Sequence, residues 1–397
     1  MPLKERVRTV NSVPTTVVIA IDSFKGSLSS SIAGNAVAEG IKKVDPQAEI
    51  EVCPIADGGE GTVDALVTGM NGVIRKILVT GPLGKSVMAQ YGLLPQKKTA
   101  VIEMAQASGL TLVADEERNP YDTTTYGVGE MIQDAMNQGV RRFFIGIGGS
   151  ATNDGGTGML KALGFQFLNK DGNEIPLGAK GLQYLDHVSD ENVSEQLKEC
   201  EFFIACDVNN PLCGEFGCSR VFAPQKGATP EMVLHMEEWM KHYAQVVLKQ
   251  YPNADADYPG AGAAGGMGFA FMTFMNAKLQ SGIEFVLEEM HIREKIKDAD
   301  YVITGEGCLD GQTVMGKAPI GVARLAKEFG KPVIAFAGSV SEDAVICNAN
   351  GIDAYFPILR SITTLEEALA PGQAMKNITD TVEQVFRVIQ IKKGSRG

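Results

Sequence analysis

Short apolar runs alternate with segments of helical periodicity near the start of the chain. The β-branched run at 17–21 precedes a polar loop, and apolar residues then recur at helical spacing over 32–41, after a serine that can cap the helix. A second strand is predicted at 49–55, and the Gly-rich segment 57–62 opens a second helix. Strands that alternate with helices in this way predict a parallel sheet.

The same alternation returns near the C-terminus. The predicted strands are 301–304, 332–337 and 354–358, the predicted helices are 319–329 and 342–350, and two more helices close the chain. The two ends of the chain therefore share one pattern, which favours a single domain built from both.

The middle of the chain has a different character, with short strands among Gly-rich loops. Strands are predicted at 100–104, 141–147, 165–168 and 201–206, and an amphipathic helix is predicted near 231–249. We therefore expect an α/β protein with two domains: a discontinuous parallel-sheet domain (15–80 and 290–397) and an inserted mixed α/β domain (81–289). Residues 1–14 are polar, end in a proline and are expected to form a disordered leader.

Composition narrows the functional classes. The chain has 397 residues, of which 44% are hydrophobic, and a net charge of −12, which argues against nucleic-acid binding. No apolar run approaches the length of a membrane span, and no complete signal peptide is seen. The seven cysteines form no CxxC pair and the chain has only four histidines, so a zinc motif or a histidine triad is not expected. We expect a cytoplasmic protein with no membrane or nucleic-acid partner; homo-oligomer formation is left open.

Acidic side chains follow the predicted strands at five places. They are Asp22 (with Lys25), Asp57 (with Glu60), Asp154, Asp207, and Glu306 with Asp310. Ligands of open α/β sheets bind beyond the carboxyl ends of the strands, so this placement indicates metal and phosphate chemistry. Any one of these aspartates could instead be a helix cap.

Two glycine-rich loops resemble nucleotide-binding motifs. The segment 146–158 matches GxGxxA, a pattern typical of dinucleotide sites, but the helix after it is short and its amides and hydroxyls suit an oligophosphate better. The segment 311–318 reads GxxxxGK but lacks the Ser or Thr of a Walker A loop, so a P-loop is not predicted. Lys317 remains a candidate for phosphate binding because it precedes a predicted helix.

Seven blocks of the sequence, in order and together spanning roughly 16–390, resemble the first type of bacterial glycerate kinase. The blocks are Ile21–Ser27, Pro54–Thr62, Gly146–Gly158, Ala205–Pro211, Pro224–Ala228, Pro259–Gly268, and Thr304–Lys317 with its Asp310 and Gln312. The resemblance implies ATP-dependent phosphorylation of D-glycerate, at the 2-hydroxyl, to give 2-phosphoglycerate. It also implies a flavodoxin-like or Rossmann-like domain formed by both termini.

The roles of individual residues are assigned mainly from their positions after predicted strands or in glycine-rich loops. All of these residues lie within the blocks that resemble the family. Catalysis is assigned to Lys25, Asp57 and Asp207, and ATP phosphate binding to Gly148, Gly149, Ser150, Thr152 and Lys317. Substrate binding is assigned to Asp22, Lys226, Glu306 and Asp310, and Mg²⁺ binding, together with ATP, to Asp154 and Asp207.

Two other functions are compatible with parts of the sequence. An NAD-dependent oxidoreductase acting on a hydroxy acid would explain GxGxxA, but it commonly needs a histidine proton relay that these loops do not supply. A non-catalytic sugar-acid binding protein with two α/β lobes would be exported and would need a signal peptide. The first alternative is tested by NADH absorbance against ADP release with glycerate as the common substrate.

Overall fold

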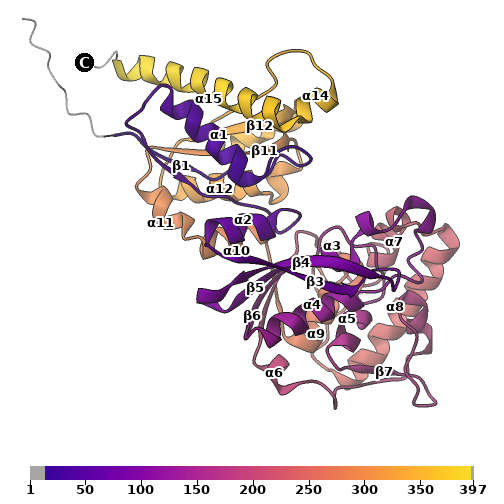
Figure 1. Ribbon diagram of the computed structural model, residues 1–397. Coiled ribbons are helices and arrows are strands. Elements are labelled where there is room, and N and C mark those ends of the chain that lie inside the picture. Colours follow the sequence, from indigo (N-terminus) through magenta and orange to yellow (C-terminus); the bar gives the residue numbers. More distant parts are fainter. Residues whose placement is uncertain (1–13, 395–397) are drawn as a thin grey trace, which may run out of the picture. The chain divides into compact units, whose positions relative to one another are not determined.

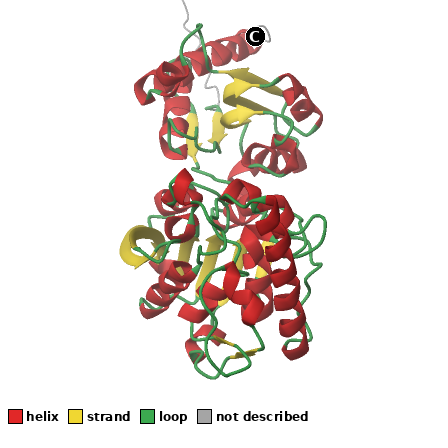
Figure 2. Ribbon diagram, turned by 90° about the vertical axis from the view of Figure 1, so that its right-hand side faces the viewer, coloured by secondary structure: helices red, strands yellow, loops and turns green. Residues whose placement is uncertain are grey.

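The computed structural model describes residues 14–394, and within them the chain divides into two compact units. Among the described residues, the first unit comprises 14–53, 291–315 and 319–394, and the second comprises 54–290 and 316–318. The predicted leader at 1–14 lies outside the described residues except for Pro14. Each unit has its own sheet (Figures 1 and 2).

The first unit contains a five-stranded sheet in which every strand is parallel to its neighbours. Its strands are β1 (Thr16–Ile19), β2 (Glu49–Val52), β11 (Tyr301–Leu309), β12 (Val333–Val340) and β13 (Ala354–Pro357). Its helices are α1 (Ser30–Lys42), α11 (Ile292–Lys297), α12 (Ala318–Glu328), α13 (Ile346–Ala349), α14 (Leu365–Leu369) and α15 (Pro371–Gly394). The strand order β2-β1-β11-β12-β13 is 2-1-3-4-5 in chain order within the unit, which is the flavodoxin-like order.

Local sequence explains the edges of these elements. Ser29 caps α1 by accepting a hydrogen bond from the Ile32 amide, and Thr364 forms a capping box with Glu367 at α14. Helices α1 and α15 lie side by side on one face of the sheet (Figure 1). Their contact is close, because a Cβ at Gly40 would lie 2.6 Å from the carbonyl oxygen of Thr379.

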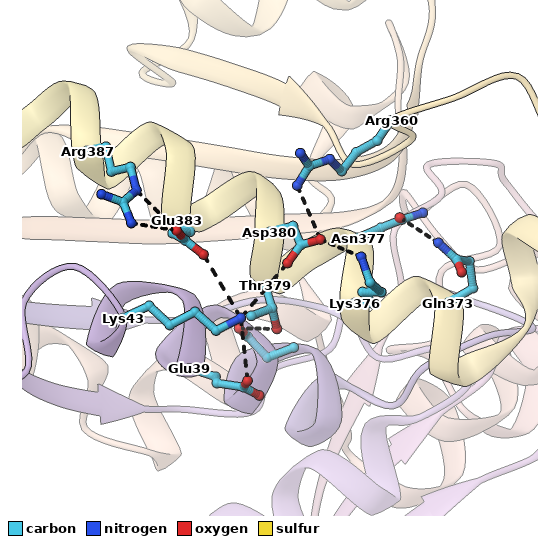
Figure 3. Close-up of polar contacts among 11 residues, drawn as sticks. Glu39, Lys43, Arg360, Gln373, Lys376, Asn377, Thr379, Asp380, Glu383 and Arg387 are labelled. Carbon is cyan, nitrogen blue, oxygen red and sulfur yellow. Dashed lines mark hydrogen bonds and ion pairs between the residues drawn. The ribbon is translucent and has the colours of Figure 1, made fainter.

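Polar groups also link α1 and α15 (Figure 3). The Thr379 hydroxyl donates to the Ala36 carbonyl at 3.1 Å. Lys43 lies 3.8 to 4.0 Å from the carboxylates of Glu39, Asp380 and Glu383. These longer ion pairs are partly exposed, so we expect the apolar helix contact to stabilise the pair more than the charges do.

The second unit contains a six-stranded mixed sheet of order β10-β9-β6-β5-β4-β3 and a separate two-stranded sheet. Its strands are β3 (Val73–Thr80), β4 (Ser86–Leu94), β5 (Thr99–Glu103), β6 (Arg142–Gly146), β7 (Gln166–Leu168), β8 (His187–Ser189), β9 (Glu201–Ala205) and β10 (Lys278–Gln280). Its helices are α2 (Thr62–Gly69), α3 (Ala105–Ser108), α4 (Tyr126–Asn137), α5 (Thr157–Ala162), α6 (Glu195–Lys198), α7 (Cys218–Phe222), α8 (Pro230–Gln250), α9 (Ala263–Met275) and α10 (Gly282–Glu289). Strands β10, β9, β6 and β5 are parallel to one another. Strand β4 pairs antiparallel with β5, and β3 pairs antiparallel with β4.

Successive side chains of β6 point to opposite faces of this sheet and pack against helices on each face. Phe144 stacks on Phe285 of α10 with ring centroids 3.9 Å apart. Its neighbour Phe143 belongs to the large core on the opposite face, with residues of α4, α8 and α9. The mixed α/β fold expected from the sequence is confirmed.

Several boundaries differ from the expected ones. Residues 54–80 belong to the second unit, because α2 packs on β4 and β5 and because β3 pairs with β4 along its whole length. Residue 290 and residues 316–318 also belong to the second unit rather than the first. Strand β11 continues to Leu309, whereas a loop was expected from residue 305, because β11 pairs with β12 as far as Leu309 and Val340. Glu306 therefore lies within a strand.

Candidate functional site

In the first unit, the candidate residues lie near or after the carboxyl ends of the two strands at which the sheet order reverses. Strand β1 is followed along the chain by β2 on one side, and the next strand of the unit, β11, pairs with β1 on the other side. The carboxyl ends of strands at such a reversal are where open α/β sheets bind ligands. Asp22 and Lys25 follow β1 there, and Glu306 lies in the C-terminal half of β11.

The loop after β1 holds one buried and one exposed charge. Asp22 is 4% exposed, and its carboxylate accepts a hydrogen bond from the Ser23 amide at 2.6 Å. Lys25 lies at the tip of a tight turn that the pairing of Phe24 with Leu28 closes, and Gly26 supplies the left-handed residue with φ of 76°. Lys25 is exposed and, among the described residues, forms no hydrogen bond or ion pair.

The Thr313 hydroxyl contacts both Glu306 and Asp310, because it also accepts the Asp310 amide at 3.1 Å. The Thr313 hydroxyl donates to the Glu306 carboxylate at 2.7 Å, and the Asp310 carboxylate accepts the amides of Gln312 and Thr313 at 2.9 and 3.0 Å. Asp310 is therefore the first residue of an Asx-type turn as well as a substrate candidate. Lys317 directly precedes α12, as the sequence predicted.

In the second unit, the loop that carries Asp57 lies directly on the ends of the parallel strands. A Cβ at Gly146, the last residue of β6, would lie 2.1 Å from the Gly58 carbonyl oxygen, and a Cβ at Gly282 would lie 2.1 Å from that of Asp57. Gly58 itself has φ of 92° and approaches Ala205 at the end of β9. These positions require glycine because backbone meets backbone.

Glu103, which the sequence analysis did not single out, holds this loop from β5. Its carboxylate accepts the amides of Gly61 at 3.1 Å and Val63 at 3.0 Å, at the N-terminus of α2. Burial raises the pKa of Glu103, although these amides act in the opposite direction. The sequence did contain a signal for Glu103, because it lies near the end of the predicted strand 100–104, as the other candidate acids lie near the ends of theirs.

Asp57 and Asp207 form the acidic centre of this unit. Asp207 follows β9, and its pKa is raised to about 6, first because the surrounding protein removes part of its hydration and second because the Asp57 carboxylate repels its charge. Asp207 as a whole residue is nonetheless exposed. One oxygen of Asp57 accepts the Gly59 amide at 3.0 Å.

The glycine-rich loop after β6 presents free backbone donors. Gly148 and Gly149 are exposed, Gly149 has φ of 72°, and the Ser150 side chain borders them. Within the chain from residue 14 to residue 394, the amides of these three residues donate no hydrogen bond. Successive free amides of this kind form an anion-binding nest.

Other segments hold this loop in place. The Leu110 amide donates to Gly149 at 2.8 Å and the Ala151 amide to Ser108 at 2.9 Å. The third glycine-rich segment of the sequence packs beneath it, since a Cβ at Gly265 would lie 2.2 Å from the Thr152 carbonyl oxygen. That segment therefore supports the loop from the inside.

The structure does not support Asp154 as a metal ligand or Thr152 as a phosphate contact. Asp154 is fully buried and its two oxygens accept four hydrogen bonds, from the amide and hydroxyl of Thr125 and the amides of Gly156 and Gly158. Burial raises the pKa of Asp154 despite these donors. Thr152 is also fully buried. Both residues therefore build the loop rather than face a ligand.

Lys226 is likewise buried rather than facing a ligand. It is 2% exposed, and its ammonium group donates to the Ser150 hydroxyl at 2.8 Å and to the Thr152 carbonyl at 2.6 Å. Burial lowers its pKa to about 8. The expectation of direct substrate binding by Lys226 is thus replaced by contact with the glycine-rich loop.

The described residues contain neither a ready-made metal cluster nor a helix suited to a membrane. No three side chains of His, Cys, Asp or Glu between residues 14 and 394 are grouped so that they could hold a metal by themselves. In the same part of the chain, no helix combines the length and the apolar character that crossing a membrane requires.

Comparison with known proteins decides the family. The sequence profile of the glycerate kinase family matches residues 17–390. The chain belongs to the glycerate kinase family. A glycerate kinase of Haemophilus influenzae is 47% identical over 94% of this chain and 99% of its own length. The glycerate 2-kinase of Escherichia coli is 47% identical over 92% of this chain and 97% of its own.

A solved structure agrees with this assignment. The crystal structure of a proposed glycerate kinase 2 from Salmonella typhimurium superposes with a TM-score of 0.89 at 44% identity, covering 96% of this chain and 100% of its own. The resemblance drawn from the sequence is confirmed, as is the enzyme class that it implies, a glycerate kinase. Membership of the glycerate kinase family removes the oxidoreductase and the binding-protein interpretations.

Proposed function

We propose that the protein transfers the γ-phosphoryl group of ATP to the 2-hydroxyl of D-glycerate, giving 2-phosphoglycerate and ADP in the cytoplasm. The observation that carries the proposal is the row of free amides at Gly148, Gly149 and Ser150, at the end of a strand that neighbours the one preceding Asp207. Phosphoryl transfer depends on positioning and charge neutralisation rather than on covalent chemistry, and these groups supply both. The name of the relative from E. coli supports the 2-position.

The donor set of the second unit fits Mg²⁺. Mg²⁺ in kinases is held by one or two carboxylates together with substrate phosphates, so a site without three protein acids is expected. Asp207 is exposed, carries a charge that a neighbouring carboxylate disfavours, and would hold the ion. When bound with ATP, Mg²⁺ neutralises charge on the phosphate oxygens.

The remaining roles follow from position. We assign Asp57 as acceptor of the proton that the 2-hydroxyl loses when its oxygen bonds to phosphorus and ADP leaves. Lys25, exposed and unpaired among the described residues, binds an anionic group, and Lys317 at the start of α12 binds phosphate. Asp22, Glu306 and Asp310 lie in the first unit, near or after the ends of β1 and β11, and we assign to them the binding of the glycerate hydroxyls.

The test is a product analysis. Purified protein with ATP, Mg²⁺ and D-glycerate should release ADP, and phosphorus NMR should show a phosphate coupled to the single proton on C2. L-glycerate and a sample without Mg²⁺ serve as controls. A product coupled to the two C3 protons would overturn the 2-position, and no glycerate-dependent ADP release would overturn the kinase proposal.

A further inference from the structure

A buried lysine lies beneath the glycine-rich loop without a carboxylate partner. Lys226 closes a 3₁₀ turn at Pro224–Lys226 and is surrounded by protein. Its two hydrogen bonds go to a hydroxyl and a carbonyl, and no ion pair joins it to any acid in the described part of the chain. Asp154 lies near enough to act on its charge, but the oxygens of that carboxylate are already taken by four other donors.

An arrangement of this kind is costly for stability. A buried ammonium loses hydration that two neutral acceptors replace only in part, and this is why burial lowers its pKa. Stability alone would favour an apolar side chain of similar size. The charge beneath this loop therefore calls for another explanation.

The hydrogen bond to Ser150 determines what that hydroxyl can do. A serine hydroxyl has one proton and two acceptor sites, and here the ammonium occupies an acceptor site. The proton of Ser150 is thus directed away from Lys226 and is available to an acceptor. The neighbouring amides of Gly148 and Gly149 need an acceptor too, so all three groups suit one anion.

We propose that Lys226 is a positioning residue for the nucleotide: it fixes the Ser150 hydroxyl as a donor and places a positive charge behind the loop that binds the ATP phosphates. The inference rests on the proposed function of this loop. Lys226 acts through Ser150 and through the field of its charge, and does not itself touch the substrate.

A double-mutant cycle tests this role. Lys226→Met, Ser150→Ala and the double variant are compared for binding of a non-hydrolysable ATP analogue by calorimetry and for KM of D-glycerate. Each single variant should weaken binding of the analogue by about 10- to 100-fold, the range of one charge-assisted hydrogen bond. The KM for D-glycerate should change by less than about twofold. The double variant should bind the analogue scarcely more weakly than Lys226→Met does, because the two side chains act as one unit.

Controls separate this role from simple support of the fold. Lys161, also largely buried, donates to the Ile175 carbonyl and pairs with Glu174, so Lys161→Met removes a comparable lysine elsewhere in the same unit and should leave nucleotide binding unchanged. Lys226→Gln keeps a donor but no charge and should be intermediate; it also serves if Lys226→Met fails to fold.

The outcomes distinguish this inference from the proposed function. Losses that add in the double variant, or equal losses for the ATP analogue and D-glycerate, would overturn the role of Lys226. If Ser150→Ala weakens the analogue but neither Lys226 variant does, the loop binds phosphate and only the inference fails. If the wild-type protein shows no ATP-dependent phosphorylation of glycerate, the proposed function itself fails.

Discussion

The Cα of Gly146 lies so close to the carbonyl oxygen of Gly58 that a Cβ on Gly146 would be 2.1 Å from it. This contact fixes the loop that carries Asp57 to the end of β6. We predict that Gly146→Ala displaces the loop, lowers kcat by about 10²-fold through misplacement of Asp57, and costs about 1–3 kcal/mol of unfolding free energy.

The control for Gly146→Ala is Gly372→Ala in α15, where no atom lies within 4 Å of the added Cβ. It should keep full activity and equal or slightly greater stability. Steady-state kinetics and urea unfolding check both variants. A Gly146→Ala protein with wild-type kcat would show that the Asp57 loop tolerates movement.

The raised pKa of Asp207 predicts opposite effects of pH on activity and on stability. Because its pKa in the folded protein is about 6, against an ordinary value of 3.8, the folded state holds this proton more tightly than the unfolded chain. The group's stabilising contribution is thus present below about pH 4 and lost as pH rises to about 6. Activity should instead fall as pH drops through about 6, because the proposed Mg²⁺ ligand becomes protonated.

Asp207→Asn tests both effects. The variant should lose kcat by about 10²-fold or more. Its Tm without ligands should exceed that of the wild type at about pH 8 and match it near pH 4. Asp171→Asn, at an exposed acid in the 169–173 turn, is the matched control and should change neither property. A Tm advantage that is independent of pH would contradict the assignment.

Lys25 should matter for activity and not for stability. Lys25→Met removes an exposed charge that no acid pairs with among the described residues, so unfolding free energy should change by less than about 0.5 kcal/mol. The value of kcat/KM should fall by the equivalent of about 2–4 kcal/mol if the ammonium stabilises a reacting anion. Lys249→Met, at the exposed C-terminal turn of α8, is the comparison variant. Equal kinetics for both would remove Lys25 from the site.

The interface between α1 and α15 should depend on shape more than on charge (Figure 3). Gly40→Ala places a methyl group 2.6 Å from the Thr379 carbonyl oxygen, so we expect a loss of about 1–3 kcal/mol. Lys43→Met removes three ion pairs of 3.8 to 4.0 Å and should cost less than about 1 kcal/mol, with a salt-dependent part. Chemical unfolding at low and high salt compares the two; a larger loss for Lys43→Met would reverse this ranking.

The sequence predicted the strands and helices that local pattern specifies. The runs that became β1, β5, β6 and β9 were found to within two residues at each end, because each is a short apolar, β-branched or aromatic run bounded by polar residues or turns. The extension of β11 through Gly305 was missed because pairing with β12 overrides the local turn signal. The β3–β4 hairpin was also missed; β3 is an edge strand whose exposed apolar residues blur the alternation.

Sequence could indicate which residues carry chemistry but not which of them face a ligand. Asp57 and Asp207 were identified from their position after strands, and the structure brings them within electrostatic reach. Asp154 and Lys226 fit the same motifs, yet their side chains turn inward. Besides its local partners Gly156 and Gly158, Asp154 binds Thr125, 29 residues away, and Lys226 binds Ser150, 76 residues away, so the tertiary fold determines their burial.

The discontinuity of the first unit has a consequence for biosynthesis. Strand β1 and helix α1 are translated before the second unit, but their partners β11 and α15 are translated after it. At about 5–20 residues per second, translation of the intervening chain takes tens of seconds. During this interval the apolar strand Thr16–Ile19 lacks its β11 neighbour while the second unit, continuous from Pro54 to Met290, can already fold. A nascent chain that stalls before α15 would therefore expose the apolar face of α1, the surface that chaperones recognise.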